Sequence, residues 1–155
     1  MRATLDLLPP AASVVVAELV PAVVEWNRRG PLAALAENPL KDKRVRVEVE
    51  DVVAVLRASR DRFDAVLLDV DNGPTPFTSS ENARLYSDQG IAAARTAIKM
   101  AGVLAVWSAR PNRKFEQRLQ YGGFVVEVES VRGRLKKGGP RHTIFLGHKS
   151  ARGTR

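Results

Sequence analysis

One stretch decides the fold, namely Phe63-Asp64-Ala65-Val66-Leu67-Leu68-Asp69-Val70-Asp71-Asn72-Gly73-Pro74. Its four consecutive apolar residues, Ala65–Leu68, are typical of a parallel strand that is buried on both faces in the middle of an α/β sheet. The carboxylates of Asp69 and Asp71 follow at once, so they lie at the carboxyl end of that strand. Open parallel sheets bind ligands outside this end of their strands. The stretch therefore predicts a central strand that leads into a polar, ligand-facing loop.

Other segments repeat the alternation of strands and helices. The expected strands, all rich in β-branched residues, are Ser13–Ala17, Val45–Val49 and Val103–Trp107; the expected helices between them are Pro21–Asn27, Asp51–Ala58 and Gln89–Met100. Two final strands, Phe124–Glu129 and His142–Leu146, have no crossover helix between them and should form an antiparallel hairpin. The pattern predicts an α/β, mostly parallel sheet with helices on both faces and a C-terminal hairpin. We expect a single domain over residues 1–148, followed by a basic flexible tail over residues 149–155.

Charge is distributed unevenly along the chain. The formal net charge is +8, yet all 17 acidic residues lie before residue 132 and are balanced there by an equal number of cations. The excess therefore belongs to the last segment, residues 132–155, which leaves nucleic acid as a weakly supported partner.

The chain contains no cysteine, which excludes disulfides and thiolate metal sites. His142 and His148 lack partners at metal-ligand spacing, so no metal is expected. No apolar run is long enough to span a bilayer, and we expect a cytoplasmic protein without a membrane partner.

Four carboxylates are the candidate site. Glu18 ends the first expected strand, Asp51 follows the second, and Asp69 and Asp71 follow the third. Acids at successive strand ends would converge on one crevice, where an acid commonly binds ribose hydroxyls. For Glu18 and Asp51 a role as a helix or turn cap is an equally good interpretation. The closely spaced Asp69 and Asp71 favour a cationic ligand.

Five segments carry a resemblance to a known family: Ala17–Pro21, Phe63–Pro74, Leu85–Ser87, Gly102–Ala109 and Arg141–Leu146. Together they resemble the spermidine synthase (polyamine aminopropyltransferase) family, in particular its spermidine-synthase-like bacterial branch. The resemblance implies a Rossmann-like sheet of the S-adenosylmethionine-methyltransferase type. It also implies aminopropyl transfer from decarboxylated S-adenosylmethionine to a polyamine such as putrescine. Relative to that family we expect an N-terminally truncated chain, without the first strand and the glycine-rich nucleoside loop.

The resemblance also assigns roles to individual residues. Glu18 resembles the acid that binds the ribose, and Asp51 resembles the acid beside the adenine. Asp69 resembles the base that deprotonates the attacking amine, Asp71 lies near the acid that holds the diamine, and Tyr86 falls in the region that closes the pocket. The family's usual Asp-Ser-Ser-Asp-Pro is replaced here by residues 69–74, which shifts the second acid by one position.

Alternatives remain beside aminopropyl transfer. The same scaffold suits a methyltransferase that uses S-adenosylmethionine itself, and a non-catalytic binding or assembly protein is a third interpretation. The missing nucleoside loop is expected to impair turnover. The two strands that would flank the missing first strand have open edges, so we expect a homo-oligomer, most simply a dimer.

Overall fold

The computed structural model describes residues 1–70, 73–74, 83–133 and 139–150. The chain divides into two compact units, Met1–Val55 and Leu56–Arg155, and the boundary lies within helix α4 (Val52–Arg57). A single domain over residues 1–148 stays a prediction.

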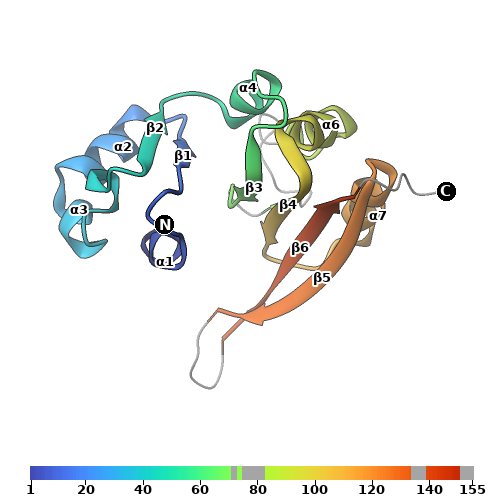
Figure 1. Cartoon of the computed structure of the whole chain (residues 1–155). Coiled ribbons are helices and arrows are strands. Elements are labelled where there is room, and N and C mark those ends of the chain that lie inside the picture. Colours follow the sequence, from blue (N-terminus) through green and yellow to red (C-terminus); the bar gives the residue numbers. More distant parts are fainter. Residues whose placement is uncertain (71–72, 75–82, 134–138, 151–155) are drawn as a thin grey trace. The chain divides into compact units, whose positions relative to one another are not determined.

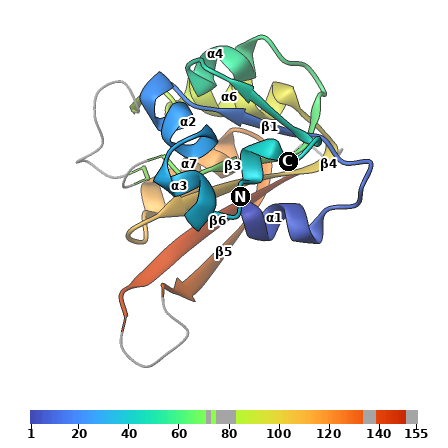
Figure 2. The same ribbon diagram turned by 90° about the vertical axis from the view of Figure 1, so that its left-hand side faces the viewer.

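The first unit is a short β-α-β arrangement. Its elements are α1 (Arg2–Leu7), β1 (Val14–Ala17), α2 (Pro21–Arg28), α3 (Pro31–Leu35), the 3₁₀ turn η1 (Pro39–Lys41) and β2 (Val45–Glu48). Strands β1 and β2 pair in parallel, from Val14 opposite Val45 to Ala17 opposite Glu48. Helices α2 and α3 connect them and pack against each other (Figure 2). Both helices begin with proline, whose fixed φ suits the first helical position.

Arg44 connects the segment that follows α1 with the segment that precedes β2. Its Nη1 donates to the carbonyl of Leu8, just after α1, at 2.9 Å, and its Nη2 donates to Asp42 Oδ2 at 2.7 Å. The hydrogen bonds that the Arg44 side chain and backbone N–H donate to the Asp42 carboxylate hold its pKa well below its usual range. The chain between α1 and β1 is thereby fixed beside the start of β2.

The second unit is a four-stranded mixed sheet (Figure 1). Its elements are β3 (Phe63–Leu68), α6 (Asp88–Ala97), β4 (Ile98–Ser108), α7 (Arg113–Tyr121), β5 (Phe124–Arg132) and β6 (Arg141–Lys149). The strand order is β3-β4-β6-β5, in which β3 and β4 are parallel and β6 is antiparallel to both of its neighbours. The α/β class and the C-terminal antiparallel hairpin are therefore confirmed.

One face of this sheet carries the core. Val66, Leu104, Val106 and Phe145 are buried there, under apolar residues of α6 and α7. The Phe115 ring of α7 meets Phe145 edge to face at 5.2 Å between centroids. The helices that pack on the sheet of this unit, among the described residues, thus cover one face, whereas the sequence pattern predicts helices on both.

The prediction that Ala65–Leu68 forms a central strand was wrong for this sheet. β3 is an edge strand, because no strand among the described residues pairs with its other side. Leu67, which points to the face opposite the core, is 63% exposed. The apolar pattern is that of a strand with neighbours on both sides, but only β4 supplies one here.

Two element boundaries differ from expectation. The helix predicted to reach Met100 ends at Ala97, because Ile98 is fully buried and pairs with Phe63 as the first residue of β4. Lys149, predicted to begin the tail, is instead the last residue of β6. Its buried Nζ donates to Asp61 Oδ1 at 2.9 Å and to the Ile98 carbonyl at 2.6 Å, which fixes the strand end. Residues 151–155 of the predicted tail lie outside the described residues.

Candidate functional site

Glu18 lies at the carboxyl end of β1, beside the end of β2. Its backbone N–H donates to the Glu48 carbonyl at 3.1 Å, so the two strand ends are held side by side. Its Oε1 accepts a hydrogen bond from the backbone N–H of Val20 at 2.9 Å, at the entry to α2. One carboxylate oxygen of Glu18 thus closes a turn before α2, whereas α2 itself, whose N-cap residue is Val20, has no side-chain cap. Oε2 has no partner among the described residues.

Asp51 occupies the same end of the first unit, three positions after the last residue of β2. Its Oδ1 accepts from the backbone N–H of Val53 at 2.8 Å, which caps the first turn of α4. The side chain is exposed. Asp51 thus caps α4 with one oxygen and has the other available, as Glu18 does at its turn, and its role beside an adenine stays a prediction.

Asp69 follows β3 directly and is exposed. The chain then turns, and the backbone N–H of Gly73 donates to the Val70 carbonyl at 3.3 Å. Gly73 has φ +70°, and a Cβ at this position would lie only 2.5 Å from the Trp107 carbonyl oxygen. The turn therefore runs against the end of β4, where only glycine fits. Asp71, the predicted diamine ligand, lies outside the described residues.

Tyr86 is a core residue in this structure. It is 4% exposed, and its ring meets Phe115 edge to face at 5.7 Å between centroids. Its hydroxyl donates to the Val70 carbonyl at 3.1 Å, the same oxygen that closes the turn. Tyr86 thus contacts the backbone beside Asp69, and direct contact with a substrate stays a prediction.

Two further residues of this region were not identified from the sequence. The side-chain amide of Asn112 donates to the Pro74 carbonyl, while its Oδ1 accepts from the Phe115 N–H at 3.1 Å and caps α7. Asn before a helical pattern is a recognisable capping signal, but nothing in the sequence indicates the second contact. Arg118 donates to the Tyr86 carbonyl at 3.1 Å and pairs with Asp88 at the same distance.

The predicted site residues fall into two groups. Glu18 and Asp51 lie at adjacent strand ends of the first unit, and Asp69 lies near Tyr86 in the second. Their convergence on one crevice stays a prediction. Within the described ranges, no three His, Cys, Asp or Glu side chains gather closely enough to hold a metal ion. No helix of those ranges is both long and apolar enough to cross a bilayer.

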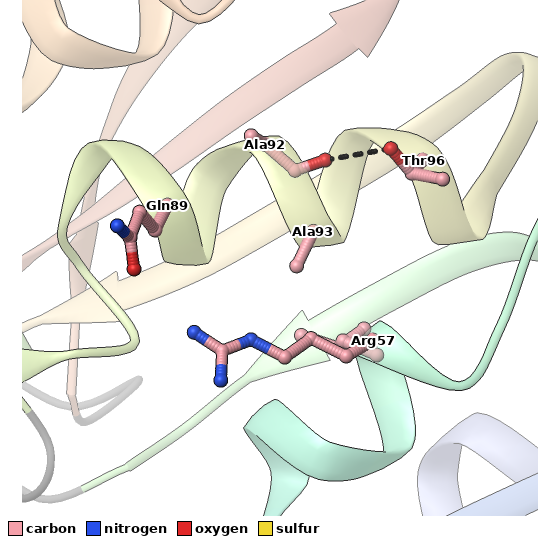
Figure 3. A pocket seen from close by; sticks show the side chains of 6 residues that line it. Arg57, Gln89, Ala92, Ala93 and Thr96 are labelled. Atoms are coloured by element: carbon pink, nitrogen blue, oxygen red, sulfur yellow. Dashed lines mark hydrogen bonds between the residues drawn. The ribbon is translucent and has the colours of Figure 1, made fainter.

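A shallow depression of about 390 Å³ lies on the helical side of the second unit (Figure 3). Its lining comes from the end of α4, with Leu56 and Arg57, and from α6, with Gln89, Ala92, Ala93 and Thr96. The Thr96 hydroxyl donates to the Ala92 carbonyl at 2.9 Å. None of the predicted site carboxylates lines this depression.

Comparison with known proteins finds likeness in structure alone. No family model matches the sequence, and no curated protein matches it. Among solved structures, the spermidine synthase of Thermotoga maritima is similar over 90% of this chain and 45% of its own, with a TM-score of 0.68 and 14% identity. A spermidine synthase in complex with the transition-state analogue AdoDATO is similar over 90% of this chain and 47% of its own, with a TM-score of 0.70 and 16% identity.

A methyltransferase is similar as well. The precorrin-6y C5,15-methyltransferase of Geobacter metallireducens matches 92% of this chain and 71% of its own, with a TM-score of 0.60 and 18% identity. The chain thus spans about half the length of the spermidine synthases. These likenesses define the fold as a Rossmann-like fold of the S-adenosylmethionine-methyltransferase type.

Proposed function

We propose that this chain belongs to the aminopropyltransferases and transfers an aminopropyl group from decarboxylated S-adenosylmethionine to a polyamine such as putrescine. One observation carries the proposal: exposed or half-exposed carboxylates follow parallel strands in both units of the fold. A cationic sulfonium donor and a cationic amine acceptor both favour such a site. The spermidine synthases among the similar structures, one with a transition-state analogue, support the same assignment.

In the proposed complex the carboxylates have separate tasks. Glu18 and Asp51 bind the nucleoside through ribose and adenine hydrogen bonds, and Asp71 holds the far ammonium of the diamine. Asp69 accepts the proton of the attacking ammonium group, which frees the nitrogen lone pair. The lone pair attacks the aminopropyl methylene carbon that is bonded to sulfur, the bond between that carbon and sulfur breaks, and its electrons remain on sulfur. The sulfonium thereby becomes the neutral thioether methylthioadenosine, and the acceptor gains one aminopropyl group.

The first experiment is calorimetric titration of the 155-residue chain with methylthioadenosine, the expected product. We expect micromolar binding that is lost in Glu18→Gln and weakened in Asp51→Asn, which removes charge but retains a capping oxygen. Glu25→Gln is the matched control, because Glu25 is an exposed acid on α2 whose contact with Arg28 at 3.4 Å is a surface pair. Absence of binding by the unmodified chain would refute a nucleoside site.

Turnover is tested by product analysis with both donors and a series of diamines. Aminopropyl transfer yields methylthioadenosine, and Asp69→Asn should lower its rate at least about 100-fold, the usual contribution of a general base. The similarity to a methyltransferase favours methyl transfer as the second candidate. S-adenosylhomocysteine as the only nucleoside product would establish that second candidate and overturn the first.

A further inference from the structure

The turn after β3 is anchored at two points by side chains from elsewhere in the second unit. At its start, the Tyr86 hydroxyl donates to the Val70 carbonyl at 3.1 Å. At its end, the Asn112 side-chain amide donates to the Pro74 carbonyl. Between these points, Gly73 packs against the end of β4 and donates its own N–H to Val70. The backbone that follows Asp69 is therefore fixed on both sides of the turn.

Both anchors depend on helix α7. Asn112 is its N-cap, so one side chain joins the start of the helix to the turn. The Tyr86 ring packs on Phe115, and Arg118 holds the Tyr86 carbonyl. Phe115 is fully enclosed in the core. A helix that is held to the core by Phe115 and Leu119 thus serves as the platform for the turn, and sites held by such rigid elements keep their geometry.

We infer that Tyr86 and Asn112 are positioning residues that set the place of the Asp69 carboxylate. The inference rests on the proposed function, since that function gives Asp69 its role as a base. Asp69 is exposed and forms no hydrogen bond or ion pair with the described residues, so its position comes from its backbone. A base must lie within hydrogen-bond reach of its proton, and a misplacement of about 1 Å can cost about 100-fold in rate.

The primary measurement is amide hydrogen exchange at Gly73, followed by NMR in the full chain without ligand. Tyr86→Phe removes only the hydroxyl and keeps the ring on Phe115. Asn112→Asp keeps an acceptor for the Phe115 N–H, so α7 remains capped, but it removes the donor to Pro74. Tyr121→Phe is the matched control, because Tyr121 is 91% exposed at the end of the same helix.

Each anchor variant should speed exchange at Gly73 about fivefold, the factor that one net hydrogen bond supplies. The exchange rates of core amides in β4 should not change. Tyr121→Phe should have the exchange rates of the unmodified chain both at Gly73 and at these core amides. In the double variant the increase in the Gly73 exchange rate should exceed the product of the increases in the two single variants if both anchors hold the same turn. Unchanged exchange at Gly73 in both single variants, with the fold intact, would overturn the inference.

Measurements of kcat and KM then distinguish a role of the two anchors in positioning Asp69 from a role in stability alone. Tyr86→Phe and Asn112→Asp should lower kcat at least about fivefold while the KM for the nucleoside donor, bound by the first unit, stays unchanged. The pH profile should keep its shape, because neither variant alters the titrating base. A faster-exchanging turn with unaltered kcat would refute the positioning role. A chain without any transfer activity would refute the proposed function, whereas the exchange result would still decide whether the anchors hold the turn.

Discussion

The ion pair at the end of β6 allows a sharp test of how the second unit is stabilised. Lys149 is 8% exposed, and its Nζ contacts the buried Ile98 carbonyl as well as Asp61. Lys149→Met keeps the aliphatic stem but removes a buried charged donor to that carbonyl, which costs about 1–3 kcal/mol. The contact with Asp61 adds little, since that side chain is 56% exposed. A loss of about 2 kcal/mol should lower the Tm by about 10 °C in a unit of this size.

The assay is thermal unfolding of the full chain, followed by near-ultraviolet circular dichroism. Lys99→Met is the matched control: Lys99 pairs with Asp64 at the same 2.9 Å, but the two side chains are 46% and 86% exposed. The control should lose less than about 1 kcal/mol. Equal shifts in the two variants, or an unchanged Tm in Lys149→Met, would refute the argument that burial makes the difference.

Three further predictions concern the turn, the first unit and the open strand edge. Gly73→Ala should lower both the Tm and the transfer rate, because φ +70° costs alanine about 1 kcal/mol and the new Cβ would meet the Trp107 carbonyl oxygen. A variant with the Tm and the transfer rate of the unmodified chain would contradict this. Because Arg44 lowers the pKa of Asp42 in the folded chain, this pair stabilises the first unit above the carboxyl's unfolded pKa, and that stability is lost as the pH falls through the folded one. Arg44→Gln should therefore be less stable at pH 7 and lose less stability below about pH 4, measured by urea unfolding across pH. Leu67→Lys should shift light scattering toward monomer if self-association uses the edge of β3 that no described strand pairs with, and an unmodified chain that is monomeric at every concentration would exclude such association.

Local signals in the sequence were sufficient for most elements of the fold. The strand of Val103–Trp107 was found from its apolar run and is indeed internal, between β3 and β6. Ser87 and Asn112 accept hydrogen bonds from backbone N–H groups of α6 and α7, as capping residues do. The apolar run of β3 does not by itself indicate an edge position, because such a run shows which neighbours a strand is suited to rather than those it has; the expectation of open strand edges came from the resemblance and its missing first strand.

The sequence was sufficient to predict which carboxylates lie at the strand ends, but not the hydrogen bonds that hold the turn beside Asp69. Carboxylates at strand ends follow from the order of elements, and Asp69 lies where that order predicts it, directly after β3. The anchoring of the turn depends on contacts between residues far apart in sequence, such as Tyr86 with Val70 and Asn112 with Pro74. The resemblance alone places Tyr86 in the region that closes the pocket, and its packing against Phe115 in the core has no local sequence signal.

Glu18 and Asp51, the two acids predicted to bind the nucleoside, differ in what it costs to break their backbone hydrogen bond in favour of a ligand. If Glu18 turned both oxygens to a ribose diol, it would release the N–H of Val20, a residue that is 47% exposed and whose amide water can therefore solvate. If Asp51 did the same, it would release the N–H of Val53, a residue that is 8% exposed and whose amide lies in a part-buried contact, so water replaces the lost hydrogen bond less readily. Glu18 can thus give both oxygens to a ligand at low cost, whereas Asp51 can give only Oδ2. We therefore expect loss of the Glu18 charge to weaken nucleoside binding more than loss of the Asp51 charge, and Asp51→Ala to act chiefly by uncapping α4.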